Sequence, residues 1–209
     1  MQIDHVIIAV NDLDAAAQRL RERFGLNAIG GGTLPIGTAN RLVPLKPPQY
    51  LELLAIDDEA IARSNPFGRL LMQRLSSGDC LLGWGVRVDD IIAEGTRLGR
   101  PVIPGMAVDG AVGRWHQVFA DLDDFEKLPF LIHYKDADSF RREAAYAEAN
   151  SPAQPGAISW LEVGDERQRM LDWLGTDNLP LRSSMGAPGL HAIAIESPGG
   201  EIVIENGNL

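Results

Sequence analysis

One arrangement of elements occurs three times along this chain, and it restricts the folds that the chain can adopt. Each copy starts with an apolar strand, an acidic helix start and a short amphipathic helix that ends at glycine; three further strand segments follow. The helix starts at Asp12, Asp90 and Asp165 are separated by 78 and then 75 residues. A period this long is typical of a supersecondary module and not of a solenoid. The sequence therefore predicts three consecutive copies of a βαβββ module.

The modules and their connectors divide the 209 residues into five segments. We expect a first module over residues 1–56, a helical connector over 57–79 and a second module over 80–135. A helix and linker follow over 136–155, and a third, more divergent module covers 156–209. Pro and Gly mark the linker. The helix before it is expected to pack across the outside of a sheet.

A single βαβββ unit has one apolar sheet face and two open edges, so it needs a partner. Two modules side by side give an eight-stranded mixed sheet, cupped into a pseudo-barrel with the helices on its convex side. The predicted fold class is therefore α+β. The third module is expected to extend or cap the pseudo-barrel, or to pair with its copy in a homodimer.

Composition limits the partners. The chain has 29 acidic and 19 basic residues and a formal net charge of −10, which argues against binding to nucleic-acid phosphates. No apolar run approaches the roughly 20 residues that a membrane helix needs, and the N-terminal residues lack the pattern of a secretion signal. The single cysteine, Cys80, fits a reducing cytoplasm. We expect a cytoplasmic protein with a small-molecule ligand, and neither a nucleic acid nor a membrane as partner.

His5 and Glu52 are polar side chains within two strands that otherwise read as apolar, Ile3–Val10 and Tyr50–Leu54. A buried carboxylate costs roughly 2–5 kcal/mol unless a cation or a donor compensates it. An imidazole is the commonest companion when that cation is a metal. The pair indicates a metal-binding cavity. Two other interpretations stay open, a structural His5 and a Glu52 that is paired with Arg41 of the adjacent strand.

Several stretches together resemble the vicinal oxygen chelate superfamily, and within it the glyoxalase-like domains. The stretches are Ile3–Ala16, Gly37–Leu42, Tyr50–Leu54, Arg114–His116 and Pro129–Ile132. The resemblance spans about residues 1–135 and is weaker for residues 156–209. It implies a cupped pair of modules around a divalent metal, with ligands from the first and last strands of each module. Members include glyoxalase I, extradiol dioxygenases and metal-free bleomycin-binding proteins, so the fold alone does not choose a reaction.

The resemblance carries ligand positions over by strand register. His5 matches the ligand of the first strand and Glu52 that of the last strand in module one. In module two the first-strand position falls on Gly83, which cannot ligate, and the last strand offers His133, or Ile132 if the register slips by one. His5, Glu52 and His133 would together form the two-histidine, one-carboxylate set that binds Zn, Fe, Mn or Ni.

Two functions remain open, besides a degenerate scaffold whose third module serves oligomerisation. The first is a metal-dependent enzyme that acts on a small oxygen-bearing metabolite as an isomerase, lyase or dioxygenase, with Glu52 as both metal ligand and catalytic base. The second is a metal-free protein that binds or sequesters a small molecule, with the ligand between Trp84 and Trp115. Asn40 is a candidate to orient the ligand in either case. The glycine at position 83 favours the second function.

Overall fold

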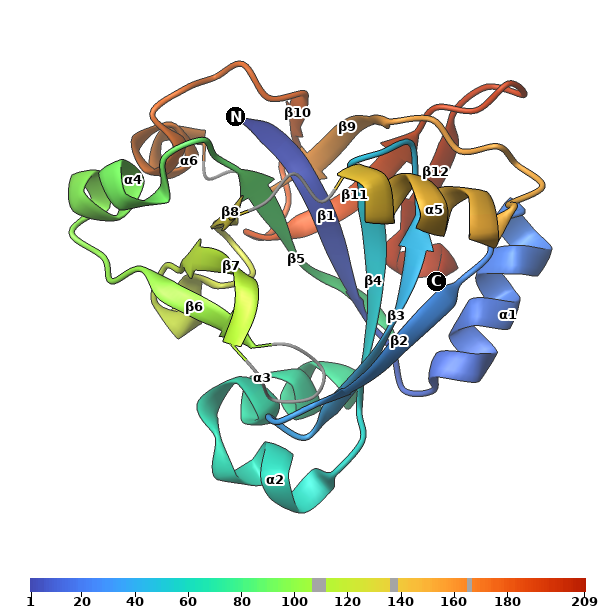
Figure 1. Ribbon diagram of the computed structural model, residues 1–209, viewed down its shortest axis with the longest axis horizontal. Helices are drawn as coiled ribbons and strands as arrows, with labels where there is room; N and C mark the ends of the chain where they lie inside the picture. The colour runs from blue at the N-terminus through green and yellow to red at the C-terminus, as the bar shows by residue number, and fades with distance from the viewer. Residues whose placement is uncertain (107–111, 136–138, 165–166) are drawn as a thin grey trace.

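The computed structural model describes residues 1–106, 112–135, 139–164 and 167–209, and these form two sheets and six α-helices (Figure 1). The first module consists of β1 (Gln2–Ala9), α1 (Leu13–Phe24), β2 (Ile29–Leu34), β3 (Thr38–Pro44) and β4 (Tyr50–Ile56). Two connector helices follow, α2 (Glu59–Ser64) and α3 (Pro66–Leu75). The second module consists of β5 (Cys80–Arg87), α4 (Ile91–Leu98), β6 (Ile103–Met106), β7 (Val112–Val118) and β8 (Phe130–Tyr134). The remaining elements are α5 (Ser139–Ala149), β9 (Ile158–Val163), α6 (Arg167–Leu174), β10 (Leu181–Ser183), β11 (Leu190–Ile195) and β12 (Ile202–Glu205).

The strands of the first two modules form one curled sheet of eight strands, in the order β2-β3-β4-β1-β5-β8-β7-β6. At its centre β1 and β5 are antiparallel neighbours, and each is parallel to the last strand of its own module, β4 or β8. Along this central pair His5 lies opposite Gly85, and Ile7 lies opposite Gly83. The predicted α+β class and the cupped sheet of paired modules are therefore confirmed.

The helices of the first two modules begin and end through the same local chemistry. The side chains of Asp12 and Asp90 each accept hydrogen bonds from two backbone N–H groups in the first turn that follows. Both helices end at a glycine in the left-handed conformation, Gly25 with φ 66° and Gly99 with φ 63°. The helix start predicted at Asp165 lies outside the described residues.

The third module forms a separate sheet of four strands, in the order β10-β9-β11-β12. Its apolar face shares one core with the convex face of the curled sheet and with α1. Leu161 and Ile193 of the small sheet and Val6 and Ile8 of β1 are fully buried in that core. The third module therefore caps the pseudo-barrel on its convex side (Figure 1).

Polar side chains tie the third module to the strands of the first two. The side-chain oxygen of Gln49 accepts from the backbone N–H of Ile158 at 2.8 Å, and its amide donates to the carbonyl of Ile3 at 2.9 Å. The indole N–H of Trp173 on α6 donates to the carbonyl of Pro129 at 2.7 Å. The contacts of Ile158 and Trp173 form only when the third module is docked, so we expect the three modules to unfold together.

Helix α5 lies on the other side of the curled sheet from the position predicted for it. It lies beside β2 and β3 (Figure 1), and Ala145 lines the cavity on the concave side. The expectation that this helix packs across the outside was wrong, because the third module already covers that face. None of the helices in the described part of the chain has the length and apolar character that a membrane crossing requires.

Asp124, in the turn before β8, joins α6 to the second module. Its carboxylate contacts Arg169 at 2.7 Å and Lys127 at 3.1 Å, and these two cations, Arg169 first, lower the pKa of Asp124. A lowered pKa stabilises the fold above the ordinary value of about 4, and this contribution disappears as the pH falls through the folded value. Both partners are part-exposed, so Asp124→Asn should lose only about 0.5 kcal/mol at neutral pH. Urea unfolding at several pH values should show this gap closing below about pH 4, and a constant gap would contradict the assignment.

Candidate functional site

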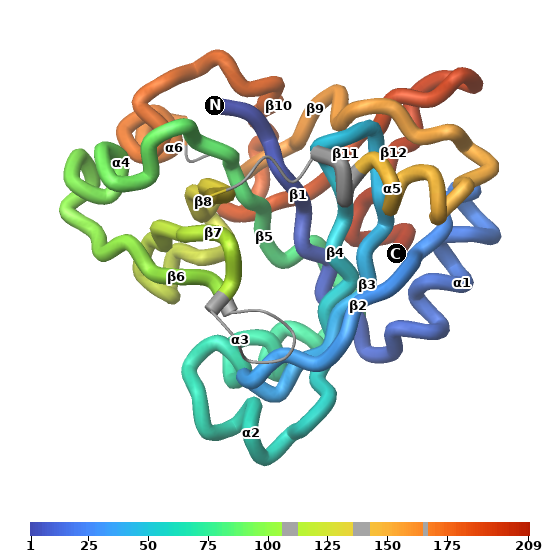
Figure 2. The backbone as a smooth tube through the Cα atoms, in the orientation of Figure 1, coloured from blue at the N-terminus to red at the C-terminus, as the bar shows by residue number. Residues whose placement is uncertain are grey.

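The concave face of the curled sheet encloses a cavity of about 760 Å³. Figure 2 shows the backbone that surrounds it, from β2 and β3 on one side to β6 and β7 on the other. Most of the wall is apolar, and seven aromatic side chains contribute to it: Tyr50, Phe67, Trp115, Phe119, Phe125, Phe130 and Tyr134. A cavity of this size with few polar groups is typical of a small-molecule site.

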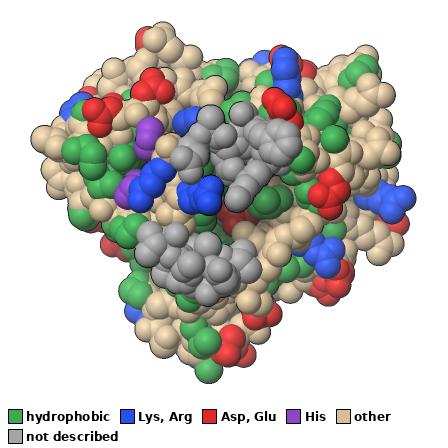
Figure 3. All heavy atoms as spheres, viewed as in Figure 1, with side chains coloured by type: hydrophobic (Ala, Val, Ile, Leu, Met, Phe, Trp, Pro, Cys, Tyr) green, Lys and Arg blue, Asp and Glu red, His purple; other side chains and the backbone are tan. Residues whose placement is uncertain are grey.

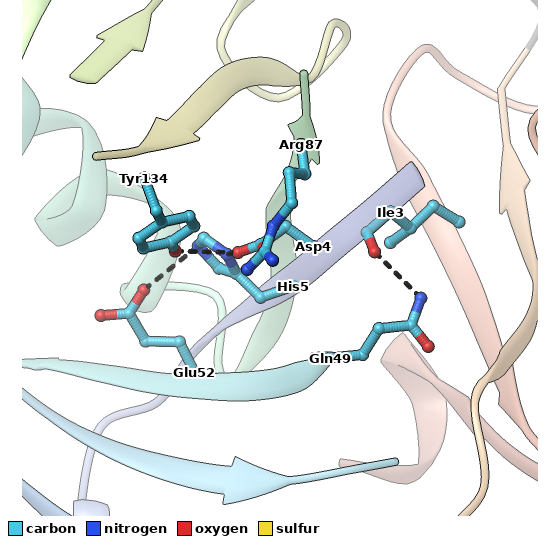
Figure 4. Close-up of polar contacts among 7 residues, drawn as sticks. All are labelled: Ile3, Asp4, His5, Gln49, Glu52, Arg87 and Tyr134. Carbon is cyan, nitrogen blue, oxygen red and sulfur yellow. Dashed lines mark hydrogen bonds and ion pairs between the residues drawn. The ribbon is translucent and has the colours of Figure 1, made fainter. Parts of the chain in front are cut away.

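His5 and Glu52 form the polar end of this cavity. They come from the parallel neighbours β1 and β4, and the distance from Nε2 of His5 to Oε2 of Glu52 is 3.8 Å (Figure 4). The imidazole of His5 is only 4% exposed and stacks on the ring of Tyr50 at 4.5 Å between ring centres. The edge of Phe130 contacts the same imidazole at 5.2 Å. The rings fix the plane of the imidazole and leave Nε2 directed at Glu52.

A buried aspartate next to His5 completes the polar group. Asp4 is fully buried, and its Oδ2 lies 2.7 Å from Nδ1 of His5 and 3.0 Å from the hydroxyl of Tyr134. Its Oδ1 accepts from Nε of Arg87 at 3.0 Å and lies 2.8 Å from Nη2 of the same guanidinium, as an ion pair (Figure 4). Neighbouring residues of a regular strand point to opposite faces, but the ladder between β1 and β5 skips Asp4 between Ile3 and His5. This bulge turns both side chains toward each other.

The Asp4 contact determines which nitrogen of His5 faces the cavity as an acceptor. A carboxylate accepts hydrogen bonds and cannot donate them, so Nδ1 of His5 carries the proton. When the ring is neutral, Nε2 has a free lone pair directed at the carboxylate of Glu52, and two acceptors then face one another across 3.8 Å at the inner end of an aromatic cavity.

The structure rejects the predicted Arg41 partner of Glu52. Arg41 pairs instead with Asp14 of α1, and Oε1 of Glu52 accepts from the side-chain amide of Asn40 at 2.7 Å. Asn40 and Trp115 both line the cavity, as predicted for ligand-binding residues. Their part in binding stays a prediction.

The structure corrects the position of His133. Along β8 the side chains of Ile132 and Tyr134 line the cavity, so His133 between them points to the opposite face. Its Nδ1 lies 3.0 Å from the carbonyl oxygen of Val88. The prediction that His133 faces the cavity as the third metal ligand was therefore wrong. The alternative register, with Ile132 facing inward, is the one observed.

The structure also corrects the position of Trp84. Gly83 and Gly85 face the hollow, whereas Trp84 between them is 1% exposed within the convex core and does not line the cavity. The glycines are covered by rings: a Cβ at position 83 would lie 3.1 Å from Phe125, and one at position 85 would lie 2.8 Å from Phe130. Two phenylalanines thus lie where the second module would offer ligands to a metal.

The predicted metal set does not fit the residues that the structure brings together. His5 and Glu52 are in place, but in the described ranges no three side chains of His, Cys, Asp or Glu are grouped to hold a metal ion. A two-histidine, one-carboxylate site needs a third ligand, and the position nearest to His5 on the central strand pair is Gly85. Metal binding therefore stays a prediction from the resemblance.

The sequence profile described as "Glyoxalase-like domain" matches residues 3–179. The chain belongs to this family. The match confirms the resemblance to the vicinal oxygen chelate superfamily and extends it past residue 135 into β9 and α6 of the third module. No protein with a curated description matched the chain.

Solved structures resemble this glyoxalase-like domain in fold. A hypothetical protein from Staphylococcus aureus is 18% identical with a TM-score of 0.63, and the alignment covers 98% of this chain and 85% of that one. Methylmalonyl-CoA epimerase from Mycobacterium tuberculosis is 19% identical with a TM-score of 0.48, covering 67% and 91% of the two chains. A Streptomyces coelicolor methylmalonyl-CoA epimerase variant in complex with 2-nitronate-propionyl-CoA is 18% identical with a TM-score of 0.49, covering 66% and 96%.

Sequence reasoning missed three residues of this glyoxalase-like site: Asp4, Arg87 and Tyr134. The signal for Asp4 was present, since Asp4 and His5 are consecutive polar residues in an otherwise apolar strand. Since β1 is buried on both faces, both residues are buried and each needs a polar partner, and the bulge lets them serve as partners of each other. The cation for Asp4 comes from the end of β5, in the other module, and no local pattern connects the two strands.

Proposed function

We propose that this glyoxalase-like domain binds a small molecule with a flat, mostly apolar body, and that it does so without a metal ion as a bridge. The body would lie among the aromatic rings of the cavity, and its polar end would meet His5 and Glu52. This conclusion deepens the second of the two functions that the sequence left open. The isomerase, lyase or dioxygenase activity of the first stays a prediction.

The covering of Gly83 and Gly85 by Phe125 and Phe130 is the observation that carries this proposal. In a metal site of the superfamily type, the second module would place ligands opposite His5 and Glu52. Here apolar rings line that half of the cavity instead, and Phe119 and Phe125 add a further stacked pair. Flat apolar molecules gain by leaving water for such a wall, at about 25 cal/mol for each Å² buried.

Filling the cavity should abolish binding while the fold is kept. Gln117 lines the cavity from β7, so Gln117→Trp places an indole in the space for the ligand. Nile red, a neutral planar dye that fluoresces in apolar surroundings, should bind this variant at least about tenfold more weakly, because the space for its rings is reduced. Gln73→Trp adds the same bulk on the exposed side of α3 and should leave the dye affinity unchanged.

Two results would contradict the proposal. Equal dye affinity in Gln117→Trp and the original protein, with both folded by circular dichroism, would mean that the dye binds elsewhere. A rise of the thermal midpoint with Zn²⁺ or Mn²⁺ that His5→Gln removes would show a metal bound at His5, because a ligand that binds the folded state stabilises it.

A further inference from the structure

We propose that the ligand of this cavity is a cation that carries N–H groups, such as a protonated amine, and that its charged end lies between His5 and Glu52. The inference rests on the proposed function, because it names the class of molecule that the cavity binds. Three properties of the cavity support it: the hydrogen-bonding character of its polar end, its charge and the rings around that end.

The polar end of the cavity presents acceptors. Nε2 of His5 and Oε2 of Glu52 face each other at 3.8 Å, which is too far for a hydrogen bond between them, and both are acceptors when the imidazole is neutral. Two donors of the cavity lining beside them are used elsewhere: the Asn40 amide donates to Oε1 of Glu52, and the Tyr134 hydroxyl donates to Asp4. A donor placed between the two free acceptors satisfies both. The ligand must therefore bring the hydrogen atoms.

The charge at this end is negative. Among the described residues that line the cavity, Glu52 is the one acidic side chain, and none is Lys or Arg. Figure 3 shows Lys and Arg side chains on the surface of the molecule, some of them beside the hollow. The guanidinium of Arg87 is held by Asp4 and lies over the ring of Tyr134 at 4.6 Å, so its charge is compensated. The net charge of −10 also favours the approach of cations over anions.

Aromatic rings surround the two acceptors. Tyr50 and Phe130 both contact the imidazole of His5, and both line the cavity. The negative face of an aromatic ring attracts a cation that has left water and disfavours an anion. A protonated amine on a flat apolar body meets all three conditions, because it supplies donors, a positive charge and an apolar surface.

Three ligands that share one flat body and differ in charge test the inference. Naphthylmethylamine is a cation at neutral pH, naphthalenemethanol is neutral and naphthoate is an anion. In isothermal titration of the whole protein, we expect the amine to bind at least about tenfold more tightly than the alcohol, because its donors meet a charged acceptor. We expect the naphthoate to bind most weakly, because it brings a carboxylate to Glu52.

Glu52→Gln removes the charge and keeps the size of the side chain. We expect it to weaken binding of the amine about 10- to 100-fold, the cost of a hydrogen bond to a charged group, and to change binding of the alcohol by less than about threefold. Retained binding of the alcohol shows that the cavity of the variant is intact. Glu162→Gln on β9, outside the cavity lining, makes the same change and should leave all three affinities as they were.

The outcomes of these titrations distinguish a failure of the cation inference from a failure of the proposed function. An alcohol or a naphthoate that binds as tightly as the amine would overturn this inference and leave the proposed function in place. The same holds if Glu52→Gln keeps the preference for the amine. If none of the three ligands binds, or if Gln117→Trp binds them as the original protein does, the proposed function is overturned as well.

Discussion

Replacing Asp4 with asparagine lowers the free energy of unfolding by about 3 kcal/mol, because it leaves the charge of Arg87 without its partner. Asp4 is fully buried and meets His5, Arg87 and Tyr134 at once. Asparagine keeps the shape but brings an amide with half the accepting capacity, so at least one of the three donors is left unsatisfied. Urea unfolding followed by circular dichroism measures the loss.

Asp14→Asn is the matched control for this change. Asp14 also pairs with an arginine, Arg41, but its side chain is 81% exposed, so the expected loss is within about 0.5 kcal/mol. If Asp4→Asn were no more costly than Asp14→Asn, the buried polar group described here would not exist in solution.

The second large effect concerns the third module. Trp173 is 8% exposed, and its indole N–H donates to the carbonyl of Pro129 beside β8. We expect Trp173→Ala to cost about 3–5 kcal/mol, as for other large core truncations. Trp173→Phe keeps a ring and loses the hydrogen bond, so it should cost about 1–2 kcal/mol.

Unfolding of Trp173→Ala should remain a single transition, because the third module shares one core with the convex face of the curled sheet. Circular dichroism and tryptophan fluorescence should therefore give the same urea midpoint. Two separate urea transitions, of which the substitution of Trp173 shifts only the first, would show that the third module unfolds as an independent unit.

Much of the fold follows from patterns that act locally. The aspartates at the helix starts and the glycines at the helix ends define the repeat, and alternation along β1 and β4 brings His5 and Glu52 to one face. Each of these features is decided by neighbours within a few residues in the sequence. For that reason they can be recognised before the structure is known.

The errors at the site have different causes. His133 was assigned to the cavity by strand register, and a shift of one residue turns a strand side chain to the other face. Trp84 was chosen as an aromatic wall without regard to register, although a count that turns Gly83 inward turns Trp84 outward. The connection between β7 and β8 contains the short helical turn Leu122–Asp124, whose length cannot be inferred from module one. The bulge at Asp4 was not predicted, because the pairing of β1 with β5 determines it.

A crystal structure of the protein soaked with naphthylmethylamine would show where the amine binds. We expect the naphthalene rings among the aromatic side chains of the cavity, with the amine nitrogen within hydrogen-bond distance of both Nε2 of His5 and Oε2 of Glu52. Rings in the cavity with the amine turned to solvent, or a metal ion bound to those two atoms, would contradict this expectation.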